Sequence, residues 1–464
     1  MLLDKTKMPM VFSVLSNVFV LVSTLLLGFF LPKYISMETY AQYRAYLLYA
    51  NYVGLFHFGF INGIYLKYGK YDYSDLPRPK FSGYTRFLFI AQALVEVILF
   101  LLLYVIYGND GIISPVFFVV MNIFLINVNC YFALVNQFTR RFSLDAIIQL
   151  LQMGLQLFGF VLLLIFKVDN YIIFLTVVTI TNLIVLGLNC FKCKDILPVL
   201  SSSELLTFTE VKELISRGSK VMFSEYIALI VVGIDSILVN LFMSVEEFSL
   251  YAFSVSIVTG VFSLIGVIGK LVFPYLKRTE ESKRGIIYDK MKYYITLFSS
   301  VICGMVLVIP IIIDSFIPDY SGGVLIIRIL GGAAIFKGVQ DLVCVNFFKA
   351  INYEKGFIKT NSIVIAIGLF SDVFALMVFS SMNAIASASV LTFLIWYLLS
   401  DHALKKKMNM RGCKSDGFVL ATTVLFYACV FLKPVIGLII YYPVLFVLAL
   451  CFHKLYNTGT ESDH

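Results

Sequence analysis

Charged residues are scarce in this sequence, and long polar stretches are missing. Of its 464 residues, 14% are charged and 60% are apolar, a balance outside the range of soluble globular chains. The longest polar stretch, residues 191–220, has about 30 residues, whereas an independent domain typically has about 100. These absences exclude a soluble catalytic domain, and we expect an integral membrane protein.

Motifs of nucleotide- or metal-dependent chemistry are also missing. The sequence has no Walker motif and no dinucleotide fingerprint, and we expect no cofactor. Cys190 and Cys193 form a C-x-x-C pair, but no second pair of ligands accompanies it, so we expect no metal site.

Apolar runs predict about fourteen transmembrane helices, because one span needs about 20 mostly apolar residues. No small-residue cleavage site follows the first run, so we expect it to stay attached as a span. The runs centre near Val20, Phe56, Val95, Asn127, Gln156, Val178, Ile230, Val261, Ile302, Phe336, Ile367, Leu391, Leu425 and Leu445.

The positions of Lys and Arg predict the orientation of these spans. Thirty of the 36 basic residues fall in alternate connecting segments and only four in the others, and basic residues mark cytoplasmic loops. Both termini are therefore expected to be cytoplasmic, with short outer loops. The same distribution explains the net charge of +8, so we expect no nucleic-acid partner. Arg328 and Lys337 are the two basic residues that this topology leaves unexplained.

A short internal similarity predicts a repeat. Segments 36–43 and 244–251 share Ser, Glu, an aromatic residue and Tyr at matching positions, offset by 208 residues, and each precedes or opens a predicted span. Six spans separate the copies, which predicts two parallel halves with a site between them. A local alternative is that Ser-x-Glu before an apolar run is a common helix start.

These residues carry a resemblance to a known family. The segments 31–32, 35–40, 246–251 and 317–320, together with Asp235, resemble the polysaccharide flippases of the multidrug/oligosaccharidyl-lipid/polysaccharide exporter superfamily. The resemblance implies an all-α polytopic protein with two six-helix bundles in a V around a central cavity, which moves lipid-linked oligosaccharides between leaflets. The corresponding division is an N-terminal bundle at 1–190, a cytoplasmic linker at 191–216, a C-terminal bundle at 217–404, and two additional helices with a short tail at 405–464.

Polar side chains inside two neighbouring spans predict a cavity wall. Asp145, Gln149, Gln152 and Gln156 lie within about 60° of one another on one helix face. Asn122, Asn129 and Asn136 recur every seven residues in the preceding span. We expect Gln149, Gln152, Gln156, Asn122 and Asn129 to contact the substrate; the alternative is hydrogen bonding between packed helices.

Basic residues within the predicted tenth span are candidates for binding a diphosphate. Lys337 and Asp341 are four residues apart and could neutralise each other. Arg328 has no acidic residue within one turn, and a guanidinium forms a planar fork that matches phosphate oxygens. The alternative for Arg328 is an ion pair with Asp372 or Asp235.

Four acidic residues within predicted spans are candidates for ion coupling: Glu96, Glu225, Asp235 and Asp372. A charge at the helix centre costs roughly 2.5–3.5 kcal/mol on insertion scales, so each acid is expected to have a role that offsets this cost. Proton or sodium coupling is one such role, and structural ion pairing with Arg328 or Lys337 is the alternative.

The resulting hypothesis is a transporter rather than an enzyme. We expect a flippase of the bacterial inner membrane that moves undecaprenyl-diphosphate-linked oligosaccharide repeat units, such as O-antigen or capsule units, to the periplasmic leaflet by alternating access. Expected partners are this lipid-linked substrate, membrane lipid, and a polysaccharide polymerase with its chain-length machinery. The alternatives are a cation-coupled multidrug exporter and a membrane-embedded glycosyltransferase or polymerase, which the short outer loops disfavour.

Overall fold

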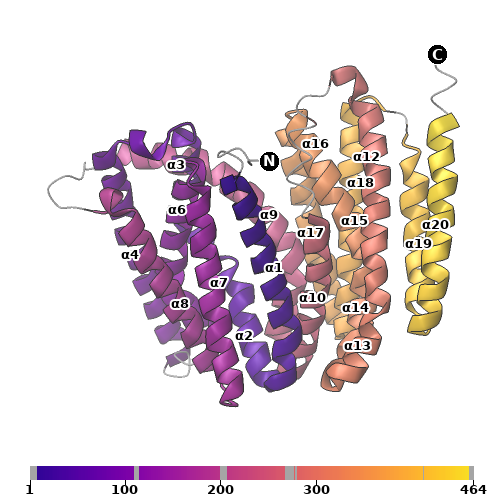
Figure 1. The fold of residues 1–464 in the computed structure, drawn as a ribbon, viewed down its shortest axis with the longest axis horizontal. Coiled ribbons are helices and arrows are strands. Elements are labelled where there is room, and N and C mark those ends of the chain that lie inside the picture. Colours follow the sequence, from indigo (N-terminus) through magenta and orange to yellow (C-terminus); the bar gives the residue numbers. More distant parts are fainter. Residues whose placement is uncertain are drawn as a thin grey trace. The chain divides into compact units, whose positions relative to one another are not determined.

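The computed structural model describes residues 8–108, 114–198, 206–266, 276, 280–410 and 412–458. Throughout these ranges the regular structure is helical and no strand occurs, which confirms the all-α fold class (Figure 1). The chain divides into two compact units, Met1–Leu229 and Ile230–His464. The basic residues Lys5 and Lys7, and positions 199–205 of the expected linker, lie outside the described residues.

The first unit is an apolar bundle with an aromatic core. Rings from three helices, among them Phe60, Tyr84 and Phe132, are at most 1% exposed and pack with Leu214 of α9. Helices α6, α7 and α8 pack side by side (Figure 1). Its elements are α1 (Met8–Tyr34), α2 (Met37–Ala50), η1 (Val53–His57), α3 (Phe60–Tyr68), α4 (Arg78–Tyr107), α5 (Pro115–Met121), α6 (Ile123–Phe138), α7 (Phe142–Ile165), α8 (Tyr171–Lys192) and the part of α9 (Phe208–Phe242) up to Leu229.

The second unit begins within α9 and contains the two helices beyond the repeat. Helix α12 packs against α15 and α19, and α17 packs against α18. Its elements are the rest of α9, α10 (Val245–Gly266), α12 (Arg284–Cys303), α13 (Ile309–Phe316), α14 (Val324–Gly331), α15 (Ala333–Val339), the π-helical turn η8 (Gln340–Cys344), α16 (Val345–Ala350), α17 (Glu354–Phe379), α18 (Met382–Lys407), α19 (Ser415–Val430) and α20 (Pro434–Thr458).

The helices account for the predicted spans, although several spans are broken. Among the described residues, nine helices are long and apolar enough to cross a membrane, and up to twelve when each of three bent helix pairs counts as one span. Helix α19 is a shorter apolar helix at the predicted thirteenth span. The chain is therefore a multi-pass membrane protein.

The predicted second span, centred near Phe56, is not one continuous helix. It consists of α2, η1 and α3, and the chain turns at Phe58 and Gly59, which both have positive φ. A Cβ on Gly59 would lie 2.3 Å from the backbone nitrogen of Ser219, and one on Gly63 would lie 2.2 Å from the carbonyl oxygen of Leu214. Close approach of α9 to these glycines explains the break.

The two units share local features at equivalent places. The Ser36 hydroxyl accepts a hydrogen bond from the Thr39 N–H, and the Ser244 hydroxyl accepts one from the Glu247 N–H, so each copy of the repeated segment caps a helix. The fourth span of the first unit bends by 48° at Asn122, and the corresponding pair in the second unit bends by 42° at Gly332. These breaks lie close to the 208-residue offset and support the repeat beyond the local helix-start explanation.

Candidate functional site

A polar cavity lies within the first unit between α6, α7 and α8. Its volume is about 210 Å³, and its polar lining comes from Asn129, Asp145, Gln149, Gln152, Asn182 and Asn189. Gln149 donates to the Asp145 carboxylate at 3.0 Å, and Gln152 donates to the Asn182 side-chain oxygen at 3.0 Å. Ligand pockets usually enclose about 300–1,000 Å³. The cavity is smaller than this range and too small for an oligosaccharide.

Two other expected substrate contacts are engaged elsewhere. Asn122 is fully buried at the break between α5 and α6, where it donates to the Thr179 hydroxyl and accepts from Asn182. Gln156 donates to the Tyr43 hydroxyl at 3.5 Å. The polar stripe of α7 therefore divides into cavity-lining residues and residues that join helices.

Glu96 has a structural partner in the first unit. Its carboxylate accepts a hydrogen bond from the Phe124 N–H at 3.0 Å, in the first turn of α6. The first backbone N–H groups of a helix have no partner within it, and a carboxylate there interacts favourably with the helix dipole. Glu96 thus caps the helix that begins after the break at Asn122.

Arg328 and Lys337 of the second unit differ in how their charges are compensated. Lys337 forms an ion pair with Asp341, as their spacing predicts, and its ammonium lies 5.5 Å from the centre of the Trp396 ring. Arg328 is half-buried in α14, and no acidic side chain within the described ranges lies at ion-pair distance from it. The alternative expectation that Arg328 pairs with Asp235 or Asp372 is therefore wrong. The buried Nε of Arg328 also has no hydrogen-bond partner among the described residues.

Asp235 and Asp372 form a buried carboxylate pair in the second unit. Asp235 is 5% exposed and accepts hydrogen bonds from the hydroxyls of Tyr251 at 2.7 Å and Ser389 at 3.0 Å. Asp372 is 1% exposed and interacts electrostatically with Asp235. One oxygen of Asp372 has no partner among the described residues. No basic side chain within those residues forms an ion pair with either carboxylate.

Glu225 lies in the first unit. It is exposed on the part of α9 that lies in the first unit, whereas Asp235 lies on the part in the second unit.

One charged cluster was missed from the sequence. Lys292 is fully buried in α12 and forms ion pairs with Asp401 of α18, at 2.7 Å, and with Asp416 of α19. Lys405 contacts the same two carboxylates at 2.7 and 2.6 Å. The charge count assigned Lys292 to an inner loop because it follows six basic residues there. The four-residue spacing of Asp401 and Lys405 was the available signal.

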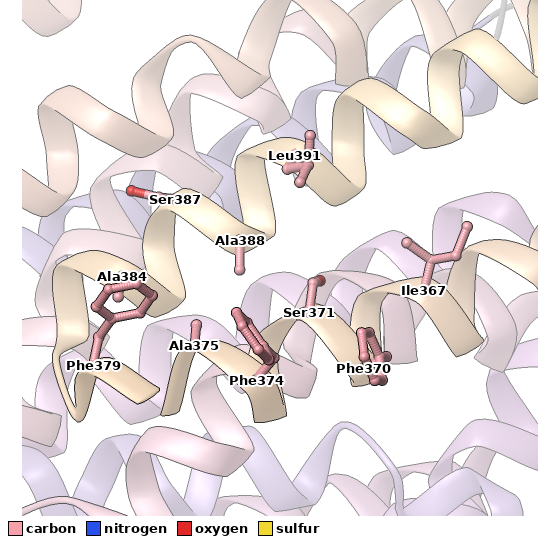
Figure 2. Close-up of a pocket in the computed structure, with 10 residues that line it drawn as sticks. All are labelled: Ile367, Phe370, Ser371, Phe374, Ala375, Phe379, Ala384, Ser387, Ala388 and Leu391. Atoms are coloured by element: carbon pink, nitrogen blue, oxygen red, sulfur yellow. The ribbon is translucent and has the colours of Figure 1, made fainter. Parts of the chain in front are cut away.

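An apolar groove lies between α17 and α18. It has a volume of about 590 Å³ and is lined by phenylalanine, alanine and branched aliphatic side chains, with Ser371 and Ser387 as its polar members (Figure 2). No charged side chain lines it. It suits hydrocarbon rather than a diphosphate.

The fold defines a multi-pass helical membrane protein. Its structure is similar to that of the lipid II flippase MurJ in an inward closed conformation, with a TM-score of 0.70 and 13% sequence identity over 98% of this chain and 99% of that chain. This likeness shows a shared fold over nearly the whole length and agrees with the fold that the flippase resemblance implies.

Weaker similarities were found to a transporter from Vibrio cholerae. A mutant form of the MATE transporter VcmN matches with a TM-score of 0.45 and 13% identity over 87% of this chain and 96% of that chain. The bent form of VcmN matches with a TM-score of 0.43 and 13% identity over 91% and 97%. No family model and no curated protein matches the sequence.

Proposed function

We propose that this chain is a flippase that carries undecaprenyl-diphosphate-linked oligosaccharide repeat units, of the O-antigen or capsule type, from the cytoplasmic to the periplasmic leaflet. The observation that carries the proposal is the fold shared with a lipid II flippase over 98% of this chain. The protein acts as a transporter and not as an enzyme, in the bacterial inner membrane with both termini in the cytoplasm. A polysaccharide polymerase and its chain-length machinery act after it.

Arg328 is the proposed diphosphate contact. It is half-buried, and no carboxylate among the described residues compensates its charge. A guanidinium can donate two parallel hydrogen bonds to phosphate oxygens, which a lysine cannot reproduce. Lys337 is a weaker candidate, because Asp341 already pairs with it.

The polar residues of the first unit are the proposed sugar contacts. Gln149, Gln152 and Asn129 line the cavity of about 210 Å³, and amides suit sugar hydroxyls because they both donate and accept. The cavity is too small for an oligosaccharide, so these groups would meet the sugar only after the bundle opens during alternating access. Asn122 and Gln156 position the neighbouring helices in this proposal.

Asp235 and Asp372 are the proposed ion-coupling pair. Two buried carboxylates that interact electrostatically repel each other when both are ionised, so binding of a proton or a sodium ion lowers the free energy. The Tyr251 and Ser389 hydroxyls supply further polar contacts to Asp235. Glu96 and Glu225 are left out, since the former caps a helix and the latter is exposed in the other unit.

Deletion and rescue in the native cell tests the function. We expect deletion to stop lipid-linked repeat units from reaching the outer leaflet and wild-type protein to restore them. Arg328→Ala should reduce rescue at least tenfold, and Arg328→Lys should rescue better than Arg328→Ala but less than the wild-type protein. The control is Arg217→Ala, on an exposed arginine paired with Glu213, which should rescue fully. Normal arrival of the repeat units after deletion would refute the flippase, as would drug resistance on expression without a glycan defect. Full rescue by Arg328→Ala would remove that residue from the site.

Substitution of the carboxylate pair tests ion coupling. We expect Asp372→Asn to abolish dependence of transport on the ion gradient while substrate binding remains, because an amide cannot exchange a proton or balance a cation. Asp314→Asn, on an exposed acid of the same unit, is the control and should behave as wild type. Unchanged gradient dependence in both Asp372→Asn and Asp235→Asn would contradict the assignment.

A further inference from the structure

A pocket with basic side chains lies at one end of the second unit. Its volume is about 450 Å³, and its polar side chains are those of Glu281, Arg284, Lys407 and Asn409. Ligand pockets usually enclose about 300–1,000 Å³, so this one has room for a small charged group. We call it the basic pocket.

Three membrane-spanning segments end around the basic pocket. Helix α12 begins at Arg284, α16 ends one residue before Ile351, and α18 ends at Lys407, and all three of these residues line the pocket. The sequence segments at these ends, 270–292, 349–359 and 405–414, hold 15 of the 36 basic residues of the chain. Basic residues mark cytoplasmic loops, so we expect the pocket at the inner surface of the membrane.

The positive charge of the basic pocket is only partly compensated. Glu281 pairs with Nη1 of Arg284 at 2.8 Å, but the Glu281 side chain is 87% exposed, and exposed ion pairs contribute little. The buried Nε of Arg284 has no hydrogen-bond partner among the described residues. The Lys407 ammonium lies 5.5 Å from the centre of the Tyr353 ring and forms no ion pair within the described ranges. The lining therefore carries one uncompensated positive charge.

The start of α12 adds backbone donors to this charge. Lys283 precedes the helix and makes no side-chain cap hydrogen bond. The first N–H groups of a helix have no partner within it and carry the positive end of the helix dipole. Gly285, in this first turn, lines the pocket with its backbone alone. Helix starts of this kind favour phosphate, and here two cationic side chains accompany the helix start.

The surroundings of the basic pocket suit a phosphate that is carried by a lipid. Nε and Nη2 form one edge of a guanidinium and can donate two parallel hydrogen bonds to a phosphate, while Nη1 of Arg284 keeps its bond to Glu281. Ile351 and Met408 also line the pocket, and Ile286 beside it in the chain is 63% exposed. A lipid covers such apolar side chains with its hydrocarbon, whereas a free phosphate ion leaves them uncovered. Basic pockets between transmembrane helices on the cytoplasmic side bind anionic headgroups.

We propose that the basic pocket binds the phosphate group of an anionic lipid of the inner leaflet, with Arg284 and Lys407 as the phosphate contacts. Because Arg284 begins α12 and Lys407 ends α18, one phosphate bridges the inner ends of two helices and stabilises the second unit. The site uses neither Arg328 nor the Asp235–Asp372 pair. It is therefore independent of the proposed transport function.

Thermal unfolding in two lipids tests this site in the purified full chain. Trp396 is the only tryptophan, lies in the second unit and is 1% exposed, so its fluorescence follows the unfolding of this unit. At about one hundred times its dissociation constant, phosphatidylglycerol should raise the midpoint by about 5–11 °C above the value in phosphatidylcholine. Equal midpoints in the two lipids would overturn the proposal. The same rise with inorganic phosphate in phosphatidylcholine would also overturn it, because the pocket would then bind a soluble ion.

Variants of two neighbouring lysines locate the binding. Lys407→Ala and Arg284→Ala should each weaken binding of phosphatidylglycerol at least tenfold, which halves the rise in midpoint, whereas Lys407→Arg keeps the cation and should retain the rise. Lys406→Ala is the matched control and should behave as wild type, because Lys406 is exposed and does not line the pocket. The midpoint of each variant in phosphatidylcholine shows that it folds. A rise in Lys407→Ala as large as that in Lys406→Ala would overturn the assignment.

Discussion

Replacement of Lys292 by methionine should destabilise the second unit strongly. Lys292 is fully buried, and its ammonium is shared by Asp401 and Asp416. Removing one partner of a buried ion pair costs about 3–5 kcal/mol, because it leaves an uncompensated charge. Lys405 still contacts both carboxylates, so we expect the lower end, about 3 kcal/mol.

The single tryptophan provides the assay for this prediction. Trp396 lies in the same unit, is 1% exposed, and donates to the Asn361 side-chain oxygen at 2.8 Å. Its fluorescence should therefore report the loss of packing on heating. A unit of this size shifts its midpoint by roughly 2–4 °C per kcal/mol, so Lys292→Met should lower the midpoint by about 6–12 °C.

Two further variants separate the buried charge from other effects. Lys290→Met, on an exposed lysine of the same helix, should change the midpoint by no more than about 2 °C, since surface substitutions are usually within about 0.5 kcal/mol. Adding Asp401→Asn to Lys292→Met should restore at least half of the loss, because the cluster is then neutral again. A midpoint of Lys292→Met equal to that of Lys290→Met would refute the reasoning.

Two predictions concern the first unit. Gly63→Ala should lower the free energy of unfolding by about 1–3 kcal/mol, the cost of overpacking, and so lower the thermal midpoint, because the new Cβ meets the Leu214 backbone. Gly154→Ala is the control and should be neutral or stabilising, since nothing lies within 4 Å of its Cβ. Glu96→Leu should lower the free energy of unfolding by about 1 kcal/mol, because it removes a helix cap. Glu96→Gln keeps an acceptor for the Phe124 N–H and should retain both stability and transport. Loss of gradient-dependent transport in Glu96→Gln would instead assign Glu96 to ion coupling.

Much of the fold could be predicted because membranes impose simple rules on sequence. Spans must be long and apolar, and helix starts have local signatures such as Ser36 and Ser244, which the structure confirms as caps. Continuity of the helices could not be predicted, because the break at Gly59 depends on the approach of α9 from 160 residues further along the chain. Tertiary contacts of this kind leave no periodic signal.

The candidate site was harder to predict, since its chemistry depends on which side chains meet. The spacing of Lys337 and Asp341 predicted their ion pair, because residues four apart on a helix are neighbours. The same reasoning could not find a partner for Arg328 or reveal that Lys292 joins α12 to α18 and α19. Glu96 looked like an ion-coupling acid because the free N–H groups of α6 appear only once the helix break is known.

Reconstituted translocation tests the central claim most directly. Purified protein in proteoliposomes should transfer a fluorescent undecaprenyl-diphosphate-linked oligosaccharide between leaflets, measured by the fraction that an added membrane-impermeant quencher reaches. The account predicts transfer by wild-type protein and by Arg217→Ala, and at least tenfold slower transfer by Arg328→Ala. Transfer no faster than in protein-free liposomes, from protein that retains the native Trp396 fluorescence, would contradict it.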